Sequence, residues 1–203
     1  MNSIEALGRL REHGHAFVTT RDAAAIFGEQ SSTVSRTLMR LAGAGLIKQL
    51  RRGHWSVDPK PSALIYAAWV TAPLPAYVSL YTALYHRGLI SQLPRVIYVA
   101  SLARTQEIET TIGVYSVHQL QPALFGGYAE ESGVRMATAE KALFDALYLA
   151  RARSGRFAGL TEIELPAGFE FGKVREYAER IVDPSARRRV SKALRELRRD
   201  LRR

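Results

Sequence analysis

The chain has 203 residues, no cysteine and a formal net charge of +10. Without cysteine it cannot hold a disulfide scaffold, a thiolate metal site or a cysteine nucleophile, and with 47% apolar residues it is not a mainly disordered protein. The longest apolar stretch, residues 63–70, is too short to span a membrane, and the N-terminus has no leader-like pattern, so we expect a soluble, cytoplasmic protein.

Three helices are predicted in the first 45 residues. The first covers residues 3–12. Thr20 is a favourable N-cap for the second, which Gly28 ends, and Ser31 can cap the third. Apolar residues recur at helical spacing along the third helix and predict one buried face, made of Val34, Leu38 and Leu41.

A basic hairpin follows these helices. Residues 46–50 and 54–57 predict two strands, joined by a tight turn at Arg51, Arg52 and Gly53. Helices followed by a basic hairpin have the layout of a winged helix-turn-helix, a fold that is used mostly to bind DNA.

The polar residues of this domain suit contacts with DNA. Short polar side chains and forked guanidinium groups can read base edges in the major groove, whereas basic hairpin residues can anchor phosphates. The predicted contacts are Ser32, Thr33, Ser35, Arg36 and Arg40 on the helix, and Arg51, Arg52 and His54 on the hairpin. The alternative is a protein-interaction module, because winged helices also serve that purpose.

A proline-containing linker at residues 58–61 ends this domain. Pro59 and Pro61 lack a backbone donor and disfavour helix at the residues before them. We therefore expect an α+β protein with two domains. The first is a winged helix-turn-helix over residues 1–58, and the second is a mixed α/β domain over residues 62–203 that ends in a basic helix.

Helices and strands alternate in the second domain. The expected order is helix 79–87, strand 95–100, hairpin 107–120, strand 134–138, a helix capped by Thr138, strand 160–165, and helices 174–181 and 185–203. Lys141 and Asp145 lie four residues apart on the Thr138 helix and are interpreted as a surface pair. Tyr77, Tyr81 and Tyr85 share the same spacing, which is more typical of core packing than of a platform for stacking bases.

The positive charge is concentrated at the C-terminus, where the last 24 residues carry ten basic and three acidic side chains. The final helix has an apolar stripe that should dock on its domain, made of Ala186, Val190, Leu194, Leu197 and Leu201. Its other side predicts a second phosphate-binding surface, for DNA or RNA, made of Arg187, Arg188, Arg189, Lys192, Arg195, Arg198, Arg199 and Arg202. The alternative is a solvated helix whose charge aids only solubility.

No set of residues in the sequence predicts catalysis, a metal site or a cofactor site, so we expect a protein that is not an enzyme. A nucleotidyltransferase would need a Gly-Ser turn followed by paired aspartates for metal ions, and the sequence lacks that pattern.

Three separated segments of the chain match one protein family in their order and spacing: residues 77–89, 93–100 and 134–145. Together they resemble the AbiEi family, the antitoxins of type IV toxin–antitoxin (abortive infection) systems. The resemblance implies an N-terminal winged helix-turn-helix joined to a C-terminal antitoxin domain. It also implies a protein that binds repeats in its own promoter and counteracts a nucleotidyltransferase toxin without forming a stable complex with it.

Two other functions stay open. A one-component regulator would use the second domain to bind a small ligand, and would need a pocket with polar groups converging in an apolar wall. The third candidate is a nucleic-acid enzyme.

Overall fold

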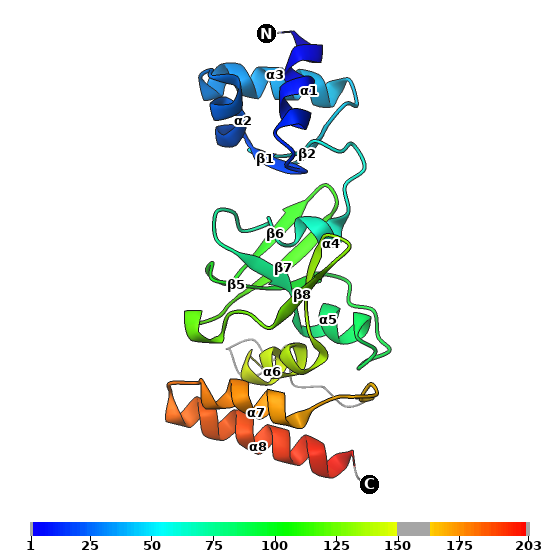
Figure 1. The fold of residues 1–203 in the computed structure, drawn as a ribbon, viewed down its shortest axis with the longest axis vertical. Coiled ribbons are helices and arrows are strands. Elements are labelled where there is room, and N and C mark those ends of the chain that lie inside the picture. Colours follow the sequence, from blue (N-terminus) through cyan, green and yellow to red (C-terminus); the bar gives the residue numbers. More distant parts are fainter. Residues whose placement is uncertain (1, 150–162, 202–203) are drawn as a thin grey trace. The chain divides into compact units, whose positions relative to one another are not determined.

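The computed structural model describes residues 2–149 and 163–201 and has the predicted α+β fold (Figure 1). The chain divides into two compact units. The first comprises Met1–Tyr66 and Glu109–Val114, and the second comprises Ala67–Ile108 and Tyr115–Arg203.

The first unit contains three main helices, a short fourth helix and a three-stranded sheet. Its elements are α1 (Ser3–Glu12), β1 (Phe17–Thr19), α2 (Thr20–Phe27), α3 (Ser31–Gly43), β2 (Lys48–Arg51), β3 (His54–Ser56) and α4 (Ala63–Tyr66). The central strand β3 pairs antiparallel with both β1 and β2. The sequence pattern did not predict β1, because three residues are too few to show a period.

Local capping explains where these helices begin. α1 has its predicted bounds. Thr19, rather than Thr20, caps α2: its hydroxyl accepts from the Asp22 N–H at 3.1 Å, and the Asp22 carboxylate accepts from the Thr19 N–H at 2.9 Å. Ser31, the predicted N-cap of α3, is the first residue of the helix instead. The N-cap is Gln30, whose side chain makes no capping bond.

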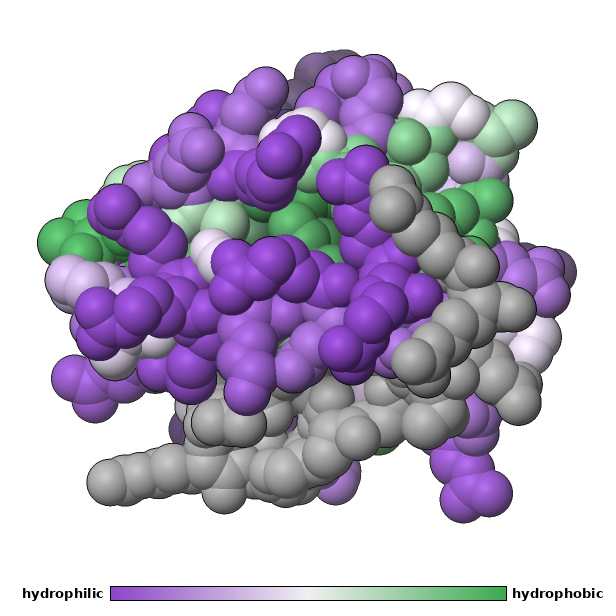
Figure 2. Space-filling model, turned by 90° about the horizontal axis from the view of Figure 1, so that it is seen from below, coloured by the Kyte–Doolittle hydropathy of each residue, from purple (hydrophilic) through white to green (hydrophobic). Residues whose placement is uncertain are grey.

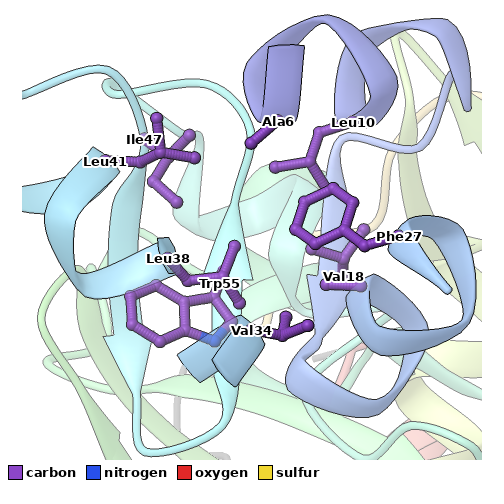
Figure 3. Packing of buried hydrophobic residues seen from close by; sticks show 10 residues of the cluster. Ala6, Leu10, Val18, Phe27, Val34, Leu38, Leu41, Ile47 and Trp55 are labelled. Atoms are coloured by element: carbon purple, nitrogen blue, oxygen red, sulfur yellow. The ribbon is translucent and has the colours of Figure 1, made fainter. Parts of the chain in front are cut away.

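One hydrophobic core holds the first unit together (Figure 3). Side chains from all three main helices meet the small sheet there, and the residues shown with labels are Ala6, Leu10, Val18, Phe27, Val34, Leu38, Leu41, Ile47 and Trp55. Trp55 also connects β3 to α2, because its indole N–H donates to the Thr20 hydroxyl at 2.9 Å. The predicted apolar face of the third helix is confirmed by this packing.

The first unit extends beyond the predicted linker. Tyr66 packs its ring on Phe17, with 5.0 Å between the ring centroids. The segment Glu109–Val114 also belongs to this unit, although the sequence places it in the second domain. Contacts of this kind between distant residues leave no trace in local composition.

The second unit is built on a six-stranded mixed sheet in the order β6-β7-β5-β4-β9-β8. The strands are β4 (Ala76–Val78), β5 (Ile97–Ser101), β6 (Gln106–Thr110), β7 (Gly113–Gln119), β8 (Tyr128–Glu131) and β9 (Val134–Ala137). β5 pairs parallel with β7 and antiparallel with β4, while β4 pairs parallel with β9. The strand at 95–100, the hairpin and the strand at 134–138 are thus confirmed, whereas β4 and β8 were not predicted.

Among the described residues of this unit, four α-helices accompany the sheet: α5 (Leu80–His86), α6 (Ala139–Leu149), α7 (Phe171–Glu179) and α8 (Pro184–Asp200). α6 is central, since it contacts α5, α7 and α8. Thr138 caps α6 as predicted, with its hydroxyl accepting from the Lys141 N–H at 3.2 Å. Asp183 caps α8 and Pro184 occupies its first turn, where a missing N–H costs nothing.

Two predictions about the secondary structure of this unit are wrong. Tyr77 does not share a helical face with Tyr81 and Tyr85, because it lies in β4 and the other two lie in α5. Residues 163–165 form no strand, and residues 160–162 of the predicted strand lie outside the described residues.

No helix in the described part of the chain is both long enough and apolar enough to cross a membrane.

Candidate nucleic-acid interface

The outward side of α3 is polar and basic. Its inward side consists of the fully buried Val34, Leu38 and Leu41. Its exposed predicted contacts are Ser32, Thr33, Arg36 and Arg40, and Ser35 is half-buried. α3 contains no acidic residue, so its exposed side offers hydroxyl and guanidinium donors without a competing carboxylate on the same helix. Such a surface can donate to base edges or phosphate oxygens.

A three-residue turn fixes α3 relative to α2. It begins at Gly28, whose φ of 67° lies in the left-handed region that favours glycine. The Glu29 N–H donates to the Ala24 carbonyl at 3.2 Å, which closes the end of α2. Arg9 on α1 donates to the Phe27 carbonyl at 3.4 Å. α3 itself packs against both preceding helices.

The turn between β2 and β3 presents Arg52 to solvent. Gly53 has a φ of 78°, again in the left-handed region, and its carbonyl accepts from the Thr20 N–H at 2.9 Å. This bond ties the hairpin turn to the start of α2. The exposed guanidinium of Arg52 is thus carried by a turn that is anchored to the helices.

Arg51 and His54 have a different environment from Arg52. Both are half-buried, with 2.9 Å between Arg51 Nη2 and His54 Nε2, and 3.1 Å between His54 Nδ1 and the Tyr66 hydroxyl. Because a guanidinium only donates, Nε2 must accept, which leaves the ring neutral with its proton on Nδ1. Burial and the nearby Arg51 charge lower the pKa of His54 from 6.5 to about 4. His54 and Arg51 therefore link the hairpin to α4, and Arg52 is the exposed member of the three predicted hairpin contacts.

The lowered pKa of His54 predicts acid sensitivity of the first unit. The unfolded chain takes up a proton near pH 6.5 and the folded chain near pH 4, so the free energy of unfolding should fall as pH falls through this window. His54→Gln should remove most of this pH dependence. Urea midpoints measured by tryptophan fluorescence at about pH 7 and about pH 5 test this prediction. If the urea midpoint of the variant fell by the same amount between these pH values, another group would be responsible.

The outer edge of β2 is covered within the first unit. Thr111 donates its N–H to the Leu50 carbonyl at 2.9 Å and its hydroxyl to the Gln49 carbonyl at 2.8 Å. β2 is an edge strand of its sheet, and edge strands present unpaired carbonyls that invite other chains. Nothing in the local sequence near residue 111 predicts this contact.

The packing of α8 separates its buried apolar stripe from the exposed basic residues near the C-terminus. Its predicted stripe is confirmed at Ala186, Val190 and Leu194, which are buried, while Leu201 is 39% exposed. The described basic residues of the predicted second surface are all exposed: Arg187, Arg188, Arg189, Lys192, Arg195, Arg198 and Arg199. Three of them, Arg187, Arg195 and Arg198, border a groove against α7. Arg202 lies outside the described residues.

The predicted surface pair of Lys141 and Asp145 is buried instead. Both side chains are 0% exposed, and the ammonium and the carboxylate are in contact. The other carboxylate oxygen accepts from the Ser79 hydroxyl at 2.7 Å and from the Tyr77 hydroxyl at 3.0 Å. These four residues, with the ring of Tyr177 on α7, are called the Lys141–Asp145 cluster below.

Aromatic rings surround the ammonium group of this cluster. Lys141 Nζ lies 5.1 to 5.5 Å from the ring centroids of Phe144, Tyr177 and Tyr77, a range in which a cation is attracted to an aromatic ring. Burial lowers the pKa of Lys141 and raises that of Asp145, and their mutual attraction opposes both shifts. Gly127, with a φ of 74°, leaves room for this arrangement, because a side chain there would collide with the Tyr177 hydroxyl.

The Lys141–Asp145 cluster joins α6 to β4 and α7. Spacing alone could not distinguish it from a surface pair, since residues four apart on any helix are neighbours. A signal was nevertheless present. α6 carries apolar residues on nearly all sides, and a helix with that composition is typically buried all round.

Neither a family model nor a curated protein matches this chain. Within residues 2–149 and 163–201, no group of three or more His, Asp or Glu side chains could hold a metal ion.

Proposed function

We propose that this chain is a DNA-binding transcriptional repressor of its own promoter, and the antitoxin of a type IV toxin–antitoxin system. The observation that carries the DNA-binding half is the polar and basic outer side of α3, which has no acidic residue and lies in the same unit as the exposed Arg52. The element order α1-β1-α2-α3-β2-β3 supports a winged helix-turn-helix.

The exposed polar and basic residues of α3 and those of the hairpin would make different contacts with DNA. Arg36 and Thr33, exposed on α3, would enter the major groove and donate to base edges. Arg52, on the turn of the hairpin, would contact phosphate and supply affinity without sequence preference. Arg51 and His54 would act indirectly, by holding the hairpin in place through their contacts with each other and with Tyr66.

The antitoxin half rests on the resemblance to the AbiEi family. The three segments that carry it correspond to β4 with α5, β5, and β9 with α6. In the sheet β4 pairs with both β5 and β9, and α5 packs against α6. The resemblance thus falls on one contiguous region of the second unit, as a shared functional domain requires. Asp145 and Lys141 lie within this region and support it structurally.

The two activities should be separable in the full-length chain. A chain with Arg36→Ala and Arg40→Ala is expected to lose repression of a reporter driven by its own promoter. It should still protect cells that express the nucleotidyltransferase toxin. Arg11→Ala, which removes one exposed charge outside α3, is the control for loss of a surface charge and should preserve both activities.

Each outcome of this experiment bears on one half of the proposal. Repression by the Arg36/Arg40 variant at the level of the unchanged chain would contradict DNA reading by α3. Absence of protection by the unchanged chain, with repression intact, would contradict the antitoxin half and favour a stand-alone regulator.

A further inference from the structure

A groove runs between α7 and α8 on the second unit. It has a volume of about 360 Å³, and Phe171, Ala178 and Leu194 contribute its apolar lining. Figure 2 views the molecule from the side of these helices and shows a strip of hydrophobic residues bordered by hydrophilic ones. The groove thus combines apolar and polar side chains.

The lining is strongly basic. It includes Arg175 on α7 and Arg187, Arg195 and Arg198 on α8, against one acidic residue, Glu179. In the described part of the chain, none of these four guanidinium groups forms an ion pair with a carboxylate. Arg195 and Arg198 lie three residues apart on α8 and repel each other, and an anion bound between them would offset this repulsion.

Two of the arginines have fixed positions. Arg187 donates from Nε and Nη2 to the Ile181 carbonyl, at 2.9 and 2.6 Å. The Arg198 guanidinium lies 5.6 Å from the centroid of the Phe171 ring, a cation–π contact. These contacts place the Arg187 charge at one end of the groove. At the other end they place the planar Arg198 guanidinium together with the Phe171 ring.

The shape of the charged region favours a linear polyanion. From Arg187 to Arg198 is eleven residues along α8, which is about 16 Å at the rise of an α-helix. That length exceeds a single phosphate group and fits a run of them. Arg188 and Arg199, on the outer side of α8, are exposed and do not line the groove.

We propose that the groove between α7 and α8 binds a short stretch of single-stranded nucleic acid. The arginines contact its phosphates, and a base lies against the Phe171 and Arg198 pair. Basic grooves with aromatic or guanidinium surfaces are the usual means of holding single strands, because every base offers a flat face. This site is independent of duplex binding by α3.

The test compares two double variants of the full chain that change net charge equally. Arg195→Gln with Arg198→Gln removes two groove arginines, and Arg188→Gln with Arg199→Gln removes two from the outer side. Binding of fluorescein-labelled oligo(U) and oligo(dT) decamers is measured by anisotropy over a series of salt concentrations. The groove variant should raise the Kd by on the order of tenfold or more, and lower the slope of log affinity against log salt by about 1.4, for two lost contacts on a single strand.

The outer-side variant should change the Kd by less than about threefold. Equal losses from the two variants would overturn the proposal, since they would indicate a general effect of charge. A Kd for UMP equal to that of the oligo(U) decamer would also overturn the proposal, and would indicate a small-ligand pocket. So would a duplex that displaces the labelled decamers more strongly than unlabelled decamers do. Promoter DNA affinity, measured on the same variants, should stay within about threefold and separates this site from the one on α3.

Discussion

Replacing Asp145 with alanine is expected to lower the free energy of unfolding by about 3 to 5 kcal/mol, the range seen when one partner of a buried ion pair is removed. Lys141 and Asp145 are both completely buried, so the substitution leaves an ammonium group without its carboxylate and away from water. The Tyr77 and Ser79 hydroxyls also lose their acceptor. Urea denaturation followed by circular dichroism measures the change.

A double variant provides the control for this prediction. Lys141→Met with Asp145→Asn removes both charges and keeps an amide oxygen that can accept from Tyr77 and Ser79. It should recover more than half of the loss, because the cost comes mainly from the charge that is left unpaired. A loss below about 1 kcal/mol for Asp145→Ala, the range typical of exposed pairs, would show that the pair is on the surface after all.

Replacing Arg36 with alanine should weaken binding to promoter DNA by about 1 to 3 kcal/mol, and leave binding to random duplex nearly unchanged. The expectation depends on the exposed position of Arg36 on α3, from which its forked donors can reach a guanine. Titration of both duplexes at one fixed salt concentration measures the difference between them.

Arg52→Ala should behave differently from Arg36→Ala. It removes an exposed charge from the hairpin turn, and so should weaken binding to promoter and random duplex by equal factors and reduce the salt slope by about 0.9. Arg11→Ala, on the exposed part of α1, is the matched control for charge. If Arg36→Ala and Arg52→Ala lost the same affinity on both duplexes, the division between base reading by α3 and phosphate contact by the hairpin would be wrong.

Most helices could be predicted from the sequence because their determinants are local. The period of apolar residues along α3 gave its buried face, and the threonine at position 138 gave the start of α6. Errors at helix starts were small, because adjacent residues can both serve as the N-cap. Thr19 and Thr20 are both suitable N-caps for α2, and only the hydrogen bonds with Asp22 decide between them.

The short strands could not be predicted in the same way. β4 has three residues and directly follows Pro75, so its pattern shows neither alternation nor length. β4 exists because β5 and β9 supply hydrogen-bond partners on its two sides. The spacing of Tyr77 from Tyr81 and Tyr85 therefore matched that of a helical face, although Tyr77 lies in a strand.

The sequence by itself determined the α+β class, the basic side of α3, the docking stripe of α8 and the excess of arginine in the tail, because these depend on residue type and on a period along one element. Only the tertiary structure decided which charged residues are exposed. Lys141 and Asp145 are buried by contacts with β4 and α7, His54 is held neutral between Arg51 and Tyr66, and the tail arginines divide between a groove and an open side. The physical reason is that burial depends on atoms contributed by segments far away in the chain, and a local pattern of charge carries no information about them.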